Sequence, residues 1–101
     1  MNLLSFLFKS GKKRQMIDDA KARGAIFVDV RTPGEFSGGK IPGSKNIPLD
    51  KLPQQKDTIK KWNKPVIVVC ASGMRSAAAK NLLAKEGIEV YNGGSWSSNV
   101  K

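Results

Sequence analysis

Cys70 is the only cysteine in this chain of 101 residues, and its neighbours could make it a nucleophile. It follows the apolar run 65–69 and precedes a helical stretch. The backbone N–H groups of a tight loop and the positive end of a helix both stabilise a thiolate and attract anions. A lone cysteine after aliphatic residues could instead fill the core. The loop residues that follow favour the nucleophile: Ala71, Ser72, Gly73, Met74, Arg75 and Ser76.

Each polar or small residue of this loop has an expected role. Gly73 would let the backbone turn with its amides facing inward, and Arg75 would add a fixed positive charge. Ser76 would cap the following helix, and Ser72 could add a hydroxyl group. The chain has no histidine, so loop amides, the helix dipole and nearby cations would have to activate Cys70. One cysteine and no histidine also argue against a zinc or copper site, and no cofactor is expected.

The composition predicts one globular domain, over residues 13–101, after an apolar and basic extension at residues 1–12. The net charge of +10 is spread over what look like solvated faces, and no nucleic-acid motif is present. We therefore expect small anions and no specific nucleic acid as partners. In the extension the apolar residues precede the basic ones, the opposite order to a secretory signal. A cytoplasmic location is expected, with export or contact with a membrane surface through the extension as alternatives.

Helical and strand patterns alternate beyond the extension, which predicts an α/β domain with a mainly parallel sheet. The apolar runs at 25–30 and 66–69 are typical of strands covered on both faces. A last strand is expected at 88–91 and a short edge strand at 45–48. Helices are expected at 13–23, around 33–36, at 50–62 with a break at Pro53, and at 76–86.

The order of several short motifs resembles that of single-domain rhodaneses. The matching segments are Asp29-Val30-Arg31, Glu35-Phe36, 39–44, Asn46-Ile47-Pro48, 70–76, Gly93-Gly94 and Trp96. The resemblance implies a three-layer domain whose mainly parallel sheet has about five short strands, with helices on both faces. The chain departs from the family in carrying Lys40 where many members have histidine. It also stops soon after Trp96, which leaves a short C-terminal helix or none.

The resemblance also implies sulfur transfer through a Cys70 persulfide, from thiosulfate or another sulfane donor to cyanide or a thiol. A sulfur-accepting protein is a further candidate partner. The family loop places Arg75 where it would hold the loop and the donor's sulfonate oxygens. Asp29 and Arg31 would support the site at the same edge of the sheet, with a purely structural ion pair or loop cap as the alternative, an alternative that is stronger for Asp29 than for Arg31.

Two other functions are consistent with these residues. A persulfide carrier or a rhodanese-like binding module would use the same fold without turnover. A cysteine phosphatase or arsenate reductase also holds a thiolate in an arginine-closed loop, but such loops place one residue more between the two. Only four residues separate Cys70 from Arg75, which favours sulfur transfer.

Overall fold

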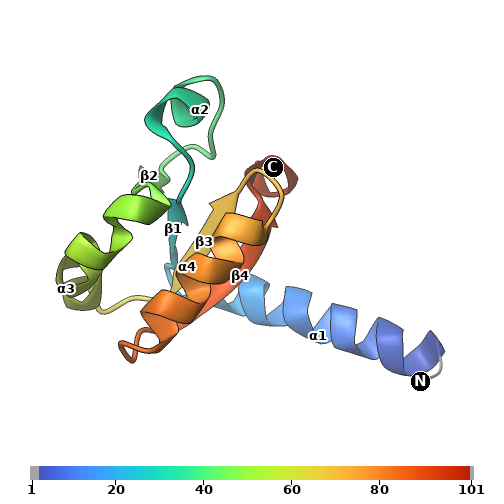
Figure 1. Cartoon of the computed structure of the whole chain (residues 1–101). Coiled ribbons are helices and arrows are strands. Elements are labelled where there is room, and N and C mark those ends of the chain that lie inside the picture. Colours follow the sequence, from blue (N-terminus) through green and yellow to red (C-terminus); the bar gives the residue numbers. More distant parts are fainter. Residues whose placement is uncertain (1–2, 101) are drawn as a thin grey trace.

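The computed structural model describes residues 3–100, and its centre is a parallel sheet with the strand order β2-β1-β3-β4 (Figure 1). The strands are Ile26–Asp29 (β1), Lys45–Asn46 (β2), Val66–Cys70 (β3) and Val90–Ser95 (β4). The expected α/β class and the edge position of β2 are confirmed. The sheet has four strands in this part of the chain, where about five were expected.

Every residue of β3 is buried, because this strand has a neighbour on each edge and helices on each face. Val66, Val68 and Cys70 belong to one apolar cluster, and Ile67 and Val69 belong to a second cluster on the opposite face. A run of β-branched residues suits this strand, since alternate side chains enter two apolar layers. Cys70 ends the run, so the fold places its sulfur at the carboxyl edge of the sheet.

Helices on both faces give the domain its three layers (Figure 1). α1 packs against β3 on the face of Ile67, and α3 and α4 cover the other face. Leu52, Ile59 and Leu83 anchor these two helices and are fully buried. The helices are Leu3–Ala22 (α1), Pro33–Ser37 (α2), Leu52–Trp62 (α3) and Met74–Ala84 (α4), with 3-10 turns at Leu49–Lys51 (η1) and Trp96–Asn99 (η2).

Several element boundaries differ from the predicted ones. α1 begins at Leu3, where the helix was expected to begin at residue 13, and it projects from the body of the domain (Figure 1). Pro53 does not break α3 but lies in its first turn, where its missing N–H costs no hydrogen bond. The last strand begins at Val90 and continues to Ser95. Within residues 3–100, no helix has the length and apolar character needed to cross a membrane.

Candidate active site

Cys70 lies at the junction of β3 and α4, where backbone N–H groups enclose its sulfur. Gly73 forms the N-terminal cap of α4 with a φ of 98°, a left-handed conformation that favours glycine. This turn directs the N–H of Gly73 at Cys70 Sγ over 3.0 Å and the N–H of Ser76 over 3.4 Å. The sulfur therefore sits at the positive end of a helix, in the amide cradle that the sequence predicted.

The surroundings of Cys70 act on its pKa in opposite directions. Burial raises the pKa, because desolvation disfavours the charged form. The hydroxyl of Ser76 and the backbone N–H groups of Ser76, Gly73 and Ser72 lower it. The hydrogen bonds prevail, so the pKa of Cys70 lies below its ordinary value. A larger fraction of the sulfur is thus thiolate, the nucleophilic form, near neutral pH.

Ser76 connects the sulfur to β4 rather than capping α4. In the thiol form Cys70 Sγ donates to Ser76 Oγ over 3.4 Å, and Ser76 Oγ donates to Asn92 Oδ1 over 2.7 Å. Asn92 Oδ1 also accepts from the N–H of Gly94, and its Nδ2 donates to the carbonyl of Gly73. Ser76 is fully buried, and the cap role predicted for it was wrong because Gly73 takes that position.

Arg75 leaves the cradle and binds a carboxylate from a distant segment. Its two terminal nitrogens donate to Glu35 Oε1 and Oε2 over 2.8 and 3.0 Å. This bidentate bond from Arg75 lowers the pKa of Glu35 to about 2, with a further contribution from the N–H of Thr32. Thr32 and Glu35 also form the capping box of α2. Arg75 therefore fastens α2 to the loop of Cys70, and both side chains of the pair remain 36% exposed.

Asp29 and Arg31 form a buried ion pair beside this edge of the sheet. Arg31 Nη2 lies 2.7 Å from Asp29 Oδ2, and Arg31 Nε donates to both carboxylate oxygens. The carboxylate also accepts the backbone N–H of Arg31 over 3.0 Å. The side chain of Asp29 has no exposed surface and that of Arg31 is 4% exposed. This geometry matches the structural ion pair, which was the alternative role considered for Asp29 and Arg31 in the sequence analysis.

The two terminal nitrogens of Arg31 also hold α2 and the segment after it in place. Nη1 donates to the carbonyl of Glu35 over 3.3 Å, and Nη2 donates to that of Gly39 over 2.6 Å. The guanidinium also lies 4.6 Å from the ring centre of Trp96. A Cβ atom at Gly39 would lie 2.7 Å from that ring, so only glycine fits the close approach. Arg31 thus connects β1, the segment after α2 and η2.

The other loop residues lie at the surface. Ala71 and Ser72 are exposed, Gly73 is half-buried and the side chain of Met74 is 81% exposed. Lys40 packs over the ring of Phe36, with its Nζ 5.0 Å from the ring centre. The residue at the position where many family members have histidine therefore supports local packing. Among residues 11–100, no hydrogen bond or ion pair joins Lys40 to Cys70.

A family model described as the Rhodanese-like domain matches residues 11–97. The chain belongs to this family. A Bacillus subtilis relative named uncharacterized protein YqhL is 44% identical over an alignment of 84 residues, and the match covers 78% of this chain and 66% of that relative. This chain therefore spans just under two thirds of that relative's length.

Two further relatives agree with the assignment. The thiosulfate sulfurtransferase GlpE of Pseudoalteromonas translucida is 29% identical over 89 residues, covering 84% of this chain and 81% of that protein. The crystal structure of a rhodanese-related protein from Thermoplasma volcanium has a TM-score of 0.71 and 30% identity, and the match covers 87% of this chain and 85% of that one. The rhodanese-like α/β fold of this chain is thus shared with solved structures.

Sequence reasoning missed two residues of this rhodanese-like site. Asn92 orients Ser76 from β4, and Glu35 binds Arg75 from α2. The signal for Asn92 was an amide side chain directly after the expected last strand at 88–91, because polar groups that become buried need partners. For Glu35 the sequence indicated only a helix-capping role, because Arg75, its second partner, lies 40 positions away in the chain.

Proposed function

We propose that this rhodanese-like protein is a sulfurtransferase that carries a sulfane sulfur as a persulfide on Cys70. The thiolate of Cys70 attacks the outer sulfur of thiosulfate and forms a new S–S bond. The bond between the two sulfur atoms of thiosulfate breaks, and sulfite leaves with the electron pair. Cyanide or an acceptor thiolate then attacks the outer sulfur of the persulfide and regenerates the Cys70 thiolate.

The observation that carries this proposal is the amide cradle around Cys70 Sγ. The N–H groups of Gly73 and Ser76 stabilise negative charge at the sulfur, both in the thiolate and when it leaves the persulfide. The cradle lies at the start of α4, so an anionic donor also gains from the helix dipole. Cys70 itself has no exposed surface, so entry of a donor requires side chains around the loop to shift.

Arg75 would bind the donor's sulfonate oxygens by exchanging its partner. Its guanidinium is half-exposed and already makes a bidentate bond to a carboxylate, whose oxygens resemble those of a sulfonate. A donor that displaces Glu35 would thus meet a preformed fork of N–H groups. GlpE of Pseudoalteromonas translucida, which is named a thiosulfate sulfurtransferase, supports thiosulfate as the donor.

The decisive experiment is intact mass measurement after incubation with thiosulfate. We expect the wild type to gain the mass of one sulfur atom and to lose it on addition of cyanide, with thiocyanate released. Cys70→Ser keeps the size of the side chain but removes the only thiol, so it should gain nothing. Persulfide formation without repeated turnover would favour the carrier function. No persulfide on the wild type would contradict both.

The same preparations test the phosphatase alternative. Only four residues separate Cys70 from Arg75, and Arg75 points to Glu35 rather than into the cradle. We therefore expect no hydrolysis of aryl phosphates. Hydrolysis by the wild type that disappears in Cys70→Ser would mean that phosphoryl transfer is the reaction.

A further inference from the structure

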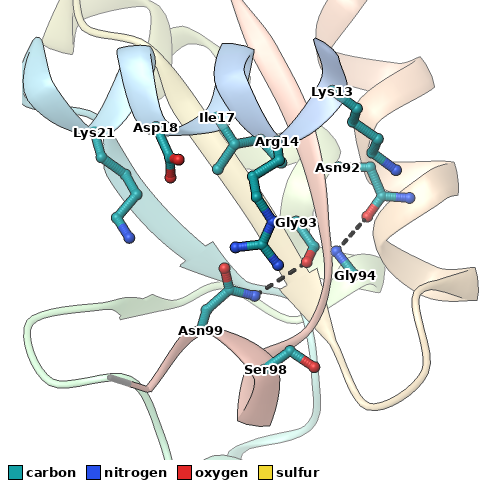
Figure 2. A pocket seen from close by; sticks show the side chains of 10 residues that line it. All are labelled: Lys13, Arg14, Ile17, Asp18, Lys21, Asn92, Gly93, Gly94, Ser98 and Asn99. Atoms are coloured by element: carbon teal, nitrogen blue, oxygen red, sulfur yellow. Dashed lines mark hydrogen bonds between the residues drawn. The ribbon is translucent and has the colours of Figure 1, made fainter. Parts of the chain in front are cut away.

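A cavity of about 450 Å³ lies apart from Cys70, between α1, the end of β4 and η2 (Figure 2). Its volume is in the range of small-molecule sites. The side chains of Lys13, Arg14 and Lys21 line it from α1, and Asp18 is the one acidic residue in its lining. In Figure 2 Arg14 extends toward Gly93, while Lys13 and Lys21 lie on either side of it. The lining therefore carries a net charge of +2.

The positive charges of this cavity are not neutralised by the protein. Among residues 11–100, no carboxylate oxygen lies within 4.0 Å of a charged nitrogen of Lys13, Arg14 or Lys21. Asp18 lies on the same helix but outside ion-pair distance of its basic neighbours. Three cations around one concavity repel each other and raise the local positive potential. An anion within the cavity would relieve this repulsion.

Two other hollows of the molecule each hold ion pairs beside a single lysine that is unpaired within residues 11–100, Lys64 in one and Lys85 in the other. In the hollow beside Pro65, Arg23 is paired with Glu89 and Asp19. In the hollow between α3 and α4, Lys56 lies 3.5 Å from Glu86, which Lys60 also approaches. The cavity beside α1 therefore differs from these two hollows in the number of cations in its lining that lack an ion pair within the described part of the chain, three against one in each.

The wall opposite α1 consists of short side chains and backbone. Asn99 Nδ2 donates to the carbonyls of Gly93 and Ser95 over 3.0 and 2.8 Å, which fastens η2 against β4. Gly93 and Gly94 bring backbone to the cavity surface, and Ser98 adds a hydroxyl. A ligand would thus meet a rigid wall with polar groups on one side and three cations on the other.

We propose that this cavity binds a small polyanion that carries phosphate or carboxylate groups. A guanidinium fork suits the paired oxygens of either group, and the two lysines add charge without fixing direction. A multivalent anion matches the net charge of the lining better than a monovalent one. The limited size of this open cavity between a helix and a strand end favours a compact molecule over a polymer.

The cavity is separate from the candidate active site but close to it. Cys70 does not line the cavity, whereas Asn92 does, and Asn92 holds the hydroxyl of Ser76 next to the sulfur. The binding proposal is independent of sulfur transfer. Cys70→Ser leaves all lining residues in place, so it should bind the polyanion as the wild type does.

The test is calorimetric titration of the folded full chain with pyrophosphate and, separately, with citrate. We expect saturable binding of one anion per chain, with perturbed backbone amide NMR signals at Gly93, Gly94 and Ser98. Arg14→Ala should weaken binding at least about tenfold, because a bidentate charged contact is lost. Lys61→Ala removes one positive charge from the exposed face of α3 and should leave the affinity within about twofold.

The outcomes separate the alternatives. Tighter binding of pyrophosphate identifies a phosphate site, and tighter binding of citrate identifies a carboxylate site. Equal losses in Arg14→Ala and Lys61→Ala would show that only the net charge attracts anions, which would overturn the proposal. Absence of saturable binding of both anions would overturn it as well. Thiosulfate turnover by the same samples reports on sulfur transfer separately.

Discussion

Arg31 and Arg75 lie at the same edge of the sheet and both bind a carboxylate in bidentate fashion, yet their surroundings differ. Arg31 is almost fully buried against Asp29, and its remaining nitrogens are used by backbone carbonyls. Arg75 and Glu35 are half-exposed, and neighbouring water competes for them. A buried arginine whose three side-chain nitrogens all have partners within the protein holds structure together. An exposed one can change its partner, which is what binding of an anionic substrate requires.

Replacing Arg31 should have the largest effect on stability. Arg31→Ala leaves the charge of Asp29 buried without its partner and frees the carbonyls of Glu35 and Gly39. We expect the free energy of unfolding to fall by about 3–5 kcal/mol. Urea denaturation measures this loss. Arg23→Ala is the matched control, because Arg23 also binds two carboxylates but at the surface, and its replacement should lower the free energy of unfolding far less. If the two variants lost equal free energy of unfolding, burial would not explain the difference between Arg31 and the exposed arginines.

Replacing Arg75 should affect activity much more than stability. In Arg75→Ala we expect kcat/KM for thiosulfate to fall by about tenfold or more, because the charged fork for the sulfonate is lost. The free energy of unfolding should change little, since water screens the exposed pair with Glu35. Steady-state thiocyanate formation and urea denaturation provide the two measurements. Unchanged kcat/KM together with a large loss of stability would make Arg75 a second structural arginine.

Glu35→Gln tests whether Arg75 exchanges partners. The neutral amide oxygen can still accept from the N–H of Thr32, so the start of α2 should persist. Thiosulfate would no longer compete with a carboxylate for Arg75, and we expect its KM to fall by about two- to fivefold with little change in kcat. Initial rates over a range of thiosulfate concentrations measure this. A rise in KM would show that Glu35 positions Arg75 for the donor instead.

The smallest expected effect is on the pH dependence of stability. Arg75 holds the pKa of Glu35 at about 2, below the ordinary value of 4.5. A carboxyl group whose pKa is lower in the folded state stabilises the fold above its unfolded pKa, and this contribution is lost as pH falls from about 4.5 to about 2. Tm should therefore decline less steeply over this range in Glu35→Gln than in the wild type. Parallel curves would show that the exposed pair adds no stability.

Local sequence was sufficient to predict the cradle of Cys70. A buried strand, a short loop with glycine and a helix are adjacent in the chain, so their geometry depends on neighbouring residues. Gly73 takes the left-handed conformation that such a turn requires. The alternation of apolar and helical patterns likewise sufficed for the parallel sheet, and the resemblance to rhodaneses implied its three layers. The helix start was misplaced by two residues because Ser76 is a common cap type, whereas Gly73 serves here without a side chain.

Only the tertiary structure decided which partners the polar side chains have. Ser76 meets Asn92 and Arg75 meets Glu35 because β4 and α2 pack beside the loop, and these segments are 16 and 40 positions away in the chain. Their positions depend on the packing of the whole sheet and its helices, which no local pattern encodes. The charge of Arg75 was readable from the sequence. Its engagement with Glu35, and the burial that separates it from Arg31, arise from packing between distant segments.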